Sequence, residues 1–480
     1  MFTDTYYRRR FMQLGFGSLG GLALNHLNAA EGKPRHHQAK ARSVILCYMS
    51  GGVSHVDSFD PKPLLKKLHG KNMPGEILRT QFDNNGKIMQ SPWKAKKYGQ
   101  SGLEMTNLFP HIADCADDIA LVRSMTADFS EHAQGNFYMH TGFPFLGVPS
   151  AGAWVNYGLG SVNQNLPGYV VLNNKTGIPH GGKSIFGSGF LPATNGASFF
   201  DLDKEEVVSR VQPRRPLKEQ RASLGFLKQL DGAFAKRSAA EGDVQSAVEN
   251  YETAFRMQTA VPELMDLDKE PDHLKRAYGF EHEDPLVARY GHQCMVARRL
   301  VEQGVRFVEL SCSNFKGDGQ RANPWDQHGN LPHGHQEMAR QVDQPIAALI
   351  NDLKQRGLLE STLIIFTGEF GRTPFSQGNN GRDHNPYGFS LWMAGGGIKG
   401  GSVHGATDEL GYHAIEDKAK VFDLWATVLH QLGMDHEKLT YRYGGRDMRL
   451  TDVHGNVMTK SFSEHRLIDN AKPNCKKERE

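Results

Sequence analysis

Carboxylate and imidazole side chains occur in four short groups that lie far apart in this 480-residue chain. Together they are the donor set that proteins use for zinc, and their oxygens also suit manganese, magnesium or calcium. The groups are His55 with Asp57 and Asp60, Asp326 and His328 with His333 and His335 close behind, Glu369 alone, and Asp383 with His384. A single Asp or His is usually only a solvated polar residue, and an Asp before Pro, like Asp60, often forms a turn. Four such groups, all at the predicted carboxyl ends of strands, predict at least one divalent metal ion among them.

A hydroxyl nucleophile is the second chemical feature that the sequence offers. Ser130 precedes Glu131 to Met139, a segment of helical character, where backbone amides and the helix dipole favour an anionic phosphate or sulfate group. The same serine suits the N-cap of that helix equally well. Thr126 is the other candidate nucleophile, and His132 is a further candidate catalytic residue. An activated hydroxyl needs a metal ion or a general base beside it.

Two arginines flank the last two acidic groups, and they allow two interpretations. Arg372 and Arg382 could clamp an oxyanion through bidentate hydrogen bonds. Alternatively, they could neutralise Glu369 and Asp383 as internal partners, which would argue against a metal ion at those carboxylates. The residue types alone leave both alternatives open.

Each candidate group follows an apolar run that is typical of a buried strand. The runs are Ser43–Met49 before His55, Ile119–Arg123 before Thr126, Val305–Leu310 before Asp326, and Leu363–Phe366 before Glu369. Short apolar runs bounded by turn residues fit strands that are covered on both faces, as in a parallel sheet. Ligands of open α/β sheets bind beyond the carboxyl ends of the strands, so we expect these groups to share one crevice.

The segments between these runs predict a single large α/β domain over residues 41–450, with a central, mostly parallel sheet flanked by helices. Residues 203–303 are rich in Glu, Lys, Arg and Ala with apolar residues three or four apart, which predicts a helical insertion on one flank of the sheet. Asn173 to Ser198 is dense in Gly, Asn and Pro and predicts a long functional or lid-like loop. Residues 451–480 are expected to form a C-terminal tail.

The N-terminal residues 1–30 resemble a twin-arginine export signal. Arg8, Arg9 and Arg10 precede a weakly apolar, Gly-rich run and a small-residue site near Ala29 and Ala30. The run is shorter than the roughly 18 residues that a membrane span needs, so we expect no stable membrane span. The sequence therefore predicts a periplasmic or extracellular protein.

The overall composition excludes several other classes of protein. With 56 Lys and Arg against 53 Asp and Glu, the formal net charge is only +3, and nothing indicates the concentrated basic face of a nucleic-acid-binding protein. The chain is 39% hydrophobic and 23% charged, which excludes a wholly disordered or membrane-spanning chain.

Three motifs behind the export signal resemble the DUF1501 family. They are Gly-Glu-Phe-Gly-Arg-Thr-Pro from Gly368, Gly-Arg-Asp-His-Asn-Pro from Gly381, and Gly-Ala-Thr-Asp-Glu-Leu-Gly from Gly405. That family has no firmly assigned activity and is similar to the alkaline phosphatase and sulfatase superfamily from about Ser43 to Arg449. The resemblance implies an alkaline-phosphatase-like fold and a one- or two-metal site that hydrolyses phosphate or sulfate esters.

The resemblance also implies roles for individual residues. It implies that Asp57 is the ligand after the first strand, that Asp326 and His328 serve one metal site, that Glu369 is the acidic ligand of the other, and that His384 is the late ligand. Phe370 departs from the superfamily pattern, in which a His follows the acidic residue, so a second metal ion lacks one ligand. The sulfatase signature, Cys or Ser with Pro and then Arg at two-residue steps, does not occur in the sequence.

Two functions follow from these observations. The first is an exported hydrolase of phosphorylated or sulfated small molecules or polysaccharides that depends on a divalent metal: zinc, manganese or calcium. Its metal ligands are Asp57, Asp326, His328, Glu369, Asp383 and His384, and its catalytic residues are Ser130, Thr126, His132, Arg372 and Arg382. The alternative is a non-catalytic glycan- or protein-binding scaffold on a degenerate hydrolase fold, since a fold alone never secures a function.

Overall fold

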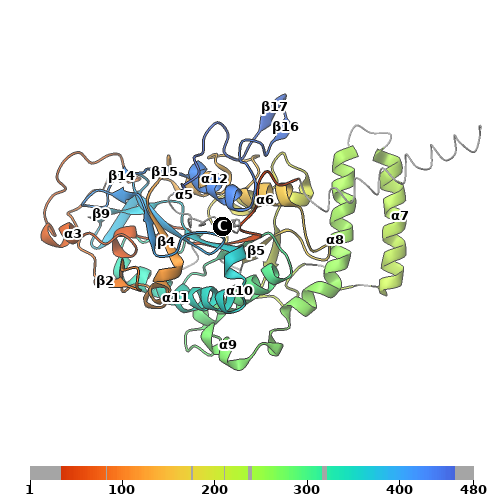
Figure 1. The fold of residues 1–480 in the computed structure, drawn as a ribbon, viewed down its shortest axis with the longest axis horizontal. Helices are drawn as coiled ribbons and strands as arrows, with labels where there is room; N and C mark the ends of the chain where they lie inside the picture. The colour runs from red at the N-terminus through yellow and green to blue at the C-terminus, as the bar shows by residue number, and fades with distance from the viewer. Residues whose placement is uncertain are drawn as a thin grey trace, which may run out of the picture.

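The computed structural model describes residues 34–82, 84–173, 177–209, 211–213, 215–235, 241–315 and 322–459. The predicted export signal at residues 1–30 and the tail beyond residue 459 lie outside the described residues. A nine-stranded sheet forms the centre of the molecule, in the order β12-β4-β11-β8-β1-β7-β5-β6, with β15 also paired to β4 (Figure 1). Its strands are β1 (Ser43–Tyr48), β4 (Ile119–Thr126), β5 (Tyr169–Asn173), β6 (Ser198–Asp201), β7 (Phe307–Ser311), β8 (Thr362–Thr367), β11 (Phe389–Ala394), β12 (Ser402–His404) and β15 (Ala419–Lys420).

The sheet is mostly parallel, as the sequence predicts. Strands β7, β1 and β8 run parallel in register, so Tyr48 lies level with Ser311 on one side and Thr367 on the other. Only β11 runs antiparallel, between β8 and β4. Because β11 is antiparallel to both of its neighbours, β4 points the same way as β8. The carboxyl ends of β1, β4, β7 and β8 therefore lie at one edge of the sheet. The candidate groups therefore leave the sheet on the same side.

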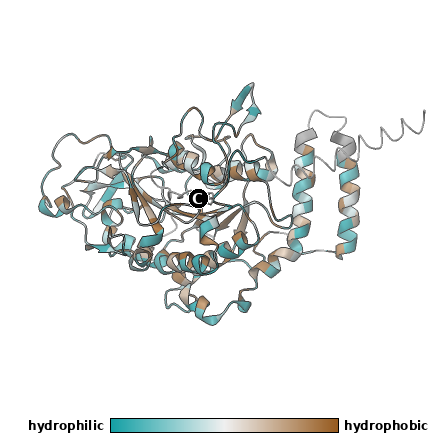
Figure 2. Ribbon diagram, in the orientation of Figure 1, coloured by the Kyte–Doolittle hydropathy of each residue, from teal (hydrophilic) through white to brown (hydrophobic). Residues whose placement is uncertain are grey.

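Helices cover both faces of the sheet, which explains why β1 is buried along its whole length. Ile45 and Cys47 belong to one apolar core, while Val44, Leu46 and Tyr48 belong to the core on the opposite face. This alternation is the two-residue period of a strand. The first core lies under α4 (Pro110–Asp114), α10 (Pro285–Glu302) and α11 (Leu331–Gln355), and the second under α5 (His132–Thr141), α6 (Ala151–Leu159) and α12 (Val421–Gln431) (Figure 1). Figure 2 shows the strands between these layers as predominantly hydrophobic.

The stretch after β8 is a buried hairpin, although its polar sequence with several Gly and Asn residues is typical of a loop. Strands β9 (Gly371–Gln377) and β10 (Gly381–Asn385) pair antiparallel, with His384 opposite Arg372. Every residue of β10 is buried. The arginines and the acidic groups satisfy one another and the backbone inside the protein, which is how charged side chains tolerate burial. The hairpin therefore holds its ionisable side chains on a rigid ladder.

Residues 203–303 are mainly helical. Helices α7 (Leu217–Ala235) and α8 (Glu241–Met265) stand side by side at one end of the molecule, whereas α9 (Asp272–Ala277) and α10 lead back under the sheet (Figure 1). Helix α10 packs against β7, β1 and β5, so the flank packing expected of the segment is found at its last helix. The limits of the insertion stay a prediction. None of the described helices has both the length and the apolarity needed to cross a membrane.

Short elements complete the periphery of the fold. They are α3 (Pro63–Lys67), the pair β2 (Ala95–Tyr98) and β3 (Leu103–Thr106), the pair β13 (Ala406–Thr407) and β14 (Ala414–Glu416), and the pair β16 (Tyr441–Tyr443) and β17 (Arg446–Met448). The segment between β5 and β6, expected to be a long loop, holds two short 3-10 helices, Gly182–Phe186 and Ala193–Asn195.

Candidate metal centre

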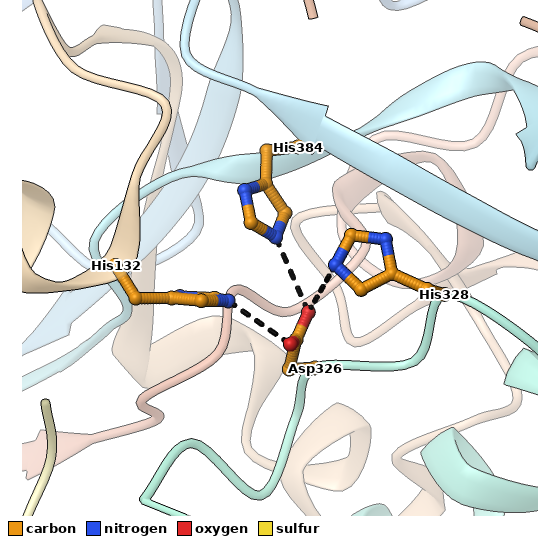
Figure 3. Close-up of side chains that lie close together, drawn as sticks. All are labelled: His132, Asp326, His328 and His384. Atoms are coloured by element: carbon orange, nitrogen blue, oxygen red, sulfur yellow. Dashed lines mark hydrogen bonds and ion pairs between the residues drawn. The ribbon is translucent and has the colours of Figure 1, made fainter. Parts of the chain in front are cut away.

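Three imidazoles and one carboxylate converge at the carboxyl edge of the sheet (Figure 3). One ligand atom from each of His132, Asp326, His328 and His384 lies within 4.8 Å of the other three. His132 begins α5 just after β4, Asp326 and His328 lie between β7 and α11, and His384 lies on β10. Each histidine faces the carboxylate of Asp326 through its Nε2 atom, at 3.1 Å for His132, 2.9 Å for His328 and 3.2 Å for His384.

The second ring nitrogen of each histidine contacts a hydrogen-bond acceptor. The three Nδ1 contacts are His132 with Glu369 Oε1, His328 with Gln377 Oε1, and His384 with the carbonyl oxygen of Ser130. An acceptor at Nδ1 requires the proton there, so in the neutral ring Nε2 keeps its lone pair. Metal-binding histidines show this arrangement almost without exception. His132 Nε2 is also buried and, apart from its contact with Asp326, has no hydrogen-bond partner in the described part of the chain.

Glu369, which the sequence analysis treats as a metal ligand, lies behind His132 and outside the four-residue cluster. Its Oε1 atom is 2.7 Å from His132 Nδ1 and accepts the Gly51 amide at 2.8 Å. The Tyr48 hydroxyl lies 3.5 Å from the other oxygen and donates to Asn136 Oδ1 at 2.7 Å. Glycine is required at position 51, because φ is +109° and a Cβ would lie 2.5 Å from the backbone nitrogen of Asp326. Glu369 thus orients His132 and fixes its Nδ1 proton.

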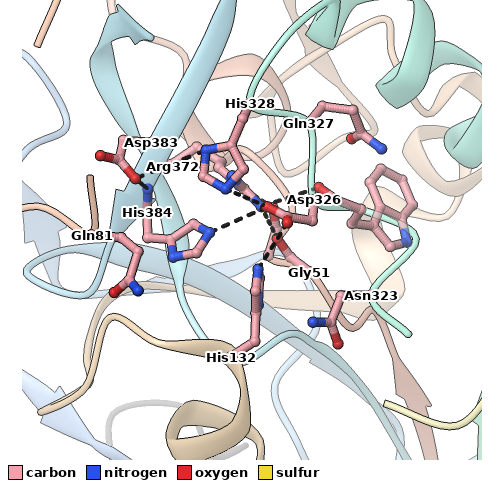
Figure 4. Close-up of polar contacts among 12 residues, drawn as sticks. Gly51, Gln81, His132, Asn323, Asp326, Gln327, His328, Arg372, Asp383 and His384 are labelled. Atoms are coloured by element: carbon pink, nitrogen blue, oxygen red, sulfur yellow. Dashed lines mark hydrogen bonds and ion pairs between the residues drawn. The ribbon is translucent and has the colours of Figure 1, made fainter. Parts of the chain in front are cut away.

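Arg372 neutralises Asp326 and not Glu369 (Figure 4). Its Nη2 atom is 2.7 Å from Asp326 Oδ1, and its other nitrogens donate to the carbonyl oxygens of Gly52 and Arg382 at 3.1 and 3.0 Å. Burial would raise the pKa of Asp326, but Arg372 and the three imidazoles hold it well below its ordinary value. Asp326 is therefore a permanently ionised carboxylate at the centre of the cluster.

The histidines differ in their affinity for protons. Burial would lower the pKa of His132, but its hydrogen bonds with Asp326 and Glu369 raise it to about 9. Burial lowers the pKa of His384 well below its ordinary value, and the contact with Asp326 does not compensate for this. This raised pKa favours a proton on both nitrogens of His132 when no cation is bound, and a cation held at Nε2 would take the place of that proton.

Asp57 and Arg382 form a separate, fully buried ion pair. Arg382 donates to both oxygens of Asp57, at 2.7 and 3.1 Å, and Ser54 donates its hydroxyl at 2.6 Å. Burial would raise the pKa of Asp57, but the Arg382 charge and these hydrogen bonds lower it. The turn His55–Asp57 directs the carboxylate toward β10, where Arg382 lies. The structure thus keeps Asp57 apart from the cluster, and Arg382 pairs with it and not with Asp383.

Asp383 is occupied with backbone amides. Its Oδ1 atom accepts the amide of His384 at 2.8 Å, and its Oδ2 atom accepts the amide of Phe82 at 3.3 Å. Oδ1 lies 4.0 Å from His328 Nδ1. These contacts make Asp383 a brace for the residues beside the cluster, and it is not among the four residues whose ligand atoms converge.

In the described part of the chain, the hydroxyl of neither predicted nucleophile is hydrogen-bonded to the cluster. The Ser130 hydroxyl donates to Gln81 Oε1 at 3.4 Å, and the Thr126 hydroxyl donates to the carbonyl oxygen of Ala419 at 3.3 Å. The capping interpretation of Ser130 is wrong, because Glu131 is the N-cap of α5 and its side chain accepts the Gln134 amide at 3.0 Å. Ser130 contributes through its carbonyl oxygen, which no residue-type argument could reveal.

A family model and several solved structures match this chain. A family model described as "Protein of unknown function (DUF1501)" matches residues 41–462. A comparison with curated proteins gives no match.

Solved structures align with most of the chain at low identity. The PsFucS1 sulfatase from Pseudoalteromonas sp. is 14% identical, with 92% of this chain and 75% of that chain covered and a TM-score of 0.37. The lipoteichoic acid synthase LtaP from Listeria monocytogenes is 10% identical, with 91% and 82% covered and a TM-score of 0.37. Alkaline phosphatase from the Antarctic bacterium TAB5 is 9% identical, with 83% and 99% covered and a TM-score of 0.33. Similarities at this level support no inference about chemistry.

Proposed function

The chain belongs to the DUF1501 family, and from that premise we propose that it is an exported, zinc-dependent hydrolase of phosphate or sulfate esters. The observation that carries the proposal is the set of three Nε2 atoms around Asp326, each on a ring whose Nδ1 contacts an acceptor. Export and a periplasmic or extracellular location rest on the sequence of residues 1–30 alone.

The donor set favours zinc over the other candidate metals. Three imidazole nitrogens and one carboxylate oxygen suit zinc, whereas calcium takes six to eight oxygen ligands and manganese prefers oxygen-rich sites. His132, His328, His384 and Asp326 would hold the ion, which supplies Lewis-acid polarisation of an ester oxygen and activation of water.

The remaining residues of the site have supporting roles in this proposal. Glu369 keeps the His132 ring in place, and Arg372 holds one oxygen of Asp326. Because the hydroxyls of Ser130 and Thr126 have other partners, we propose that water and not a side chain attacks the ester. Arg372 has its guanidinium committed to Asp326 and to backbone oxygens, so it acts by positioning that carboxylate.

Metal analysis with an activity assay tests the proposal directly. The purified protein is expected to bind one zinc ion per chain and to hydrolyse aryl phosphates or aryl sulfates. A chelator should remove both the metal and the activity, and zinc should restore both more fully than calcium does. Absence of bound zinc after reconstitution, or full activity in the chelated protein, would contradict the proposal.

Glu369→Gln should weaken zinc binding by about 10- to 100-fold without abolishing it, which is the usual effect of mutating the partner of a metal-binding histidine. Glutamine still offers an oxygen to the Gly51 amide and to His132 Nδ1, so the loss comes from the missing negative charge behind the ring. Competition with a zinc chelator of known affinity measures the change. The control is Glu360→Gln, at an exposed position away from the site. Complete loss of zinc from Glu369→Gln would instead make Glu369 a ligand.

One observation favours the non-catalytic alternative. Four protein ligands complete a tetrahedral shell, which is typical of structural zinc sites, whereas catalytic sites keep one position open. The same measurements separate the two functions. A zinc-loaded protein that binds a sulfated or phosphorylated glycan but hydrolyses no phosphate or sulfate ester would be a scaffold.

A further inference from the structure

The four cluster residues differ in how far solvent reaches them. The side chains of His132 and His384 are 8% and 1% exposed, whereas those of Asp326 and His328 are 21% and 26% exposed. Within the described part of the chain, solvent therefore reaches the cluster mainly at Asp326 and His328, and we take this as the side from which a ligand approaches. The residues on this side decide which alcohol can be attached to a phosphate or sulfate group bound at the cluster.

An exposed aromatic ring stands on this side of the cluster. The centroid of the Phe82 ring lies 4.8 Å from that of His328, at an interplanar angle of 88°, and 6.3 Å from that of His384. Phe82 is nevertheless 57% exposed. A phenylalanine on the surface is unremarkable by itself. Here, however, the ring is in edge contact with a cluster histidine while much of its surface remains uncovered.

The backbone that carries Phe82 is fixed in place although it has no regular secondary structure. We call residues 78–82 the strap. Three hydrogen bonds hold its backbone: Tyr412 hydroxyl to Leu78 carbonyl at 3.3 Å, Tyr387 hydroxyl to Arg79 carbonyl at 2.8 Å, and Phe82 amide to Asp383 Oδ2 at 3.3 Å. A fourth joins the Ser130 hydroxyl to the side chain of Gln81, at Oε1, over 3.4 Å.

Two of these anchors also belong to the surroundings of the cluster. Ser130 contacts His384 Nδ1 through its carbonyl oxygen, and Asp383 precedes His384 on β10 (Figure 4). The strap is therefore positioned by the same residues that position a cluster histidine. Because the strap is already held in place, a ligand that binds the Phe82 ring does not have to offset the entropy of ordering this segment.

We propose that Phe82 binds the alcohol part of the substrate and selects esters whose alcohol is a ring, either a pyranose sugar or a phenol. The inference rests on the proposed function, because it assumes that the phosphate or sulfate group sits at the cluster. A ring presents an apolar face of carbon and hydrogen atoms that can pack on the phenyl side chain, whereas a methyl group offers little surface for such a contact. A well-placed contact with an aromatic side chain changes affinity by about tenfold.

Binding measurements on the zinc-loaded protein test this selection without requiring turnover. Titration calorimetry with phenyl phosphate, glucose 6-phosphate, methyl phosphate and inorganic phosphate, and with the corresponding sulfates, should show about tenfold tighter binding of at least one ring ester than of the methyl ester. Phe82→Ala should abolish that difference and leave methyl ester affinity and zinc content unchanged. The phenyl and glucosyl arms distinguish a phenol from a sugar.

Phe145→Ala is the matched control, because Phe145 is 55% exposed but lies on the segment after α5 and contacts Phe143. It should behave as the wild type does. Phe82→Trp, which restores an aromatic face, should recover the preference for ring esters. Recovery by tryptophan would separate a ligand contact from a general effect of Phe82→Ala on the strap.

The outcomes for the two proposals can be told apart. Ring esters that bind preferentially but are never hydrolysed would support the role of Phe82 and contradict the hydrolase. Hydrolysis of ring and methyl esters with equal specificity constants in the wild type and Phe82→Ala would support the hydrolase and overturn the role of Phe82. Failure of every ester and of phosphate and sulfate to bind would overturn it as well.

Discussion

His328→Ala should lose its zinc at micromolar metal concentrations, and its rate of ester hydrolysis should fall by at least about a thousandfold. A metal that polarises an ester contributes several kcal/mol to the stability of the transition state, and each 1.4 kcal/mol is a factor of ten in rate. Among the four cluster residues His328 has the most exposed side chain, at 26%, so its removal leaves no large cavity in the core. Loss of one imidazole leaves two, with Asp326 still held by Arg372. The fold should therefore persist while the metal is lost.

The control for this variant is His333→Ala. His333 is an exposed histidine five residues further along the chain, and its ring contacts Phe315. Removing it deletes an imidazole of the same chemistry without touching the cluster, so zinc content and turnover should not change. Metal content by elemental analysis, circular dichroism and turnover would be recorded for both variants. A His328→Ala protein that keeps one zinc ion and full turnover would contradict the proposed site.

The convergence of distant residues was predictable because it depends on strand direction. Apolar runs before Asp326 and Glu369 mark buried parallel strands, and parallel strands deliver their following residues to one edge. Only β11 departs from that rule. Because it is antiparallel to both β8 and β4, those two strands still point the same way. His132 enters the cluster for the same reason that the other residues do, since it follows β4 by a few residues. The short distance from a predicted strand indicates this position for His132, although its residue type alone suggests a catalytic role equally well.

The exact partners were not predictable, because they depend on side-chain geometry across the hairpin. Glu369 and Asp57 are acidic residues after strands, as Asp326 is, yet one orients a histidine and the other pairs with Arg382. What separates them is the pairing of β9 with β10, which places Arg372 near Asp326 and Arg382 near Asp57. A polar sequence rich in Gly and Asn predicts a loop there, and burial of its charges is visible only in three dimensions.

Asp57→Ala should destabilise the protein by about 3–5 kcal/mol, because it leaves the Arg382 charge buried without its partner. Both side chains are 0% exposed, and Arg382 donates to both oxygens of Asp57. Its other hydrogen bonds, to the carbonyl oxygens of Thr373 and Met89, do not supply a negative charge. Denaturant unfolding of the wild type and the variant under the same conditions measures the loss.

Two comparisons make the Asp57 result specific. Asp447→Ala, which breaks the exposed pair with Arg442, should cost no more than about 1 kcal/mol. The double variant Asp57→Leu with Arg382→Met should be more stable than Asp57→Ala, since it removes the uncompensated charge and fills the space with apolar atoms. Folded Asp57→Ala should still bind one zinc ion, because its carboxylate is occupied by Arg382 and Ser54 and lies outside the cluster. A folded Asp57→Ala protein that lost its zinc but kept wild-type stability would contradict this. Asp57 would then be the metal ligand that its position after the first strand suggests, and the buried ion pair with Arg382 would break when metal binds.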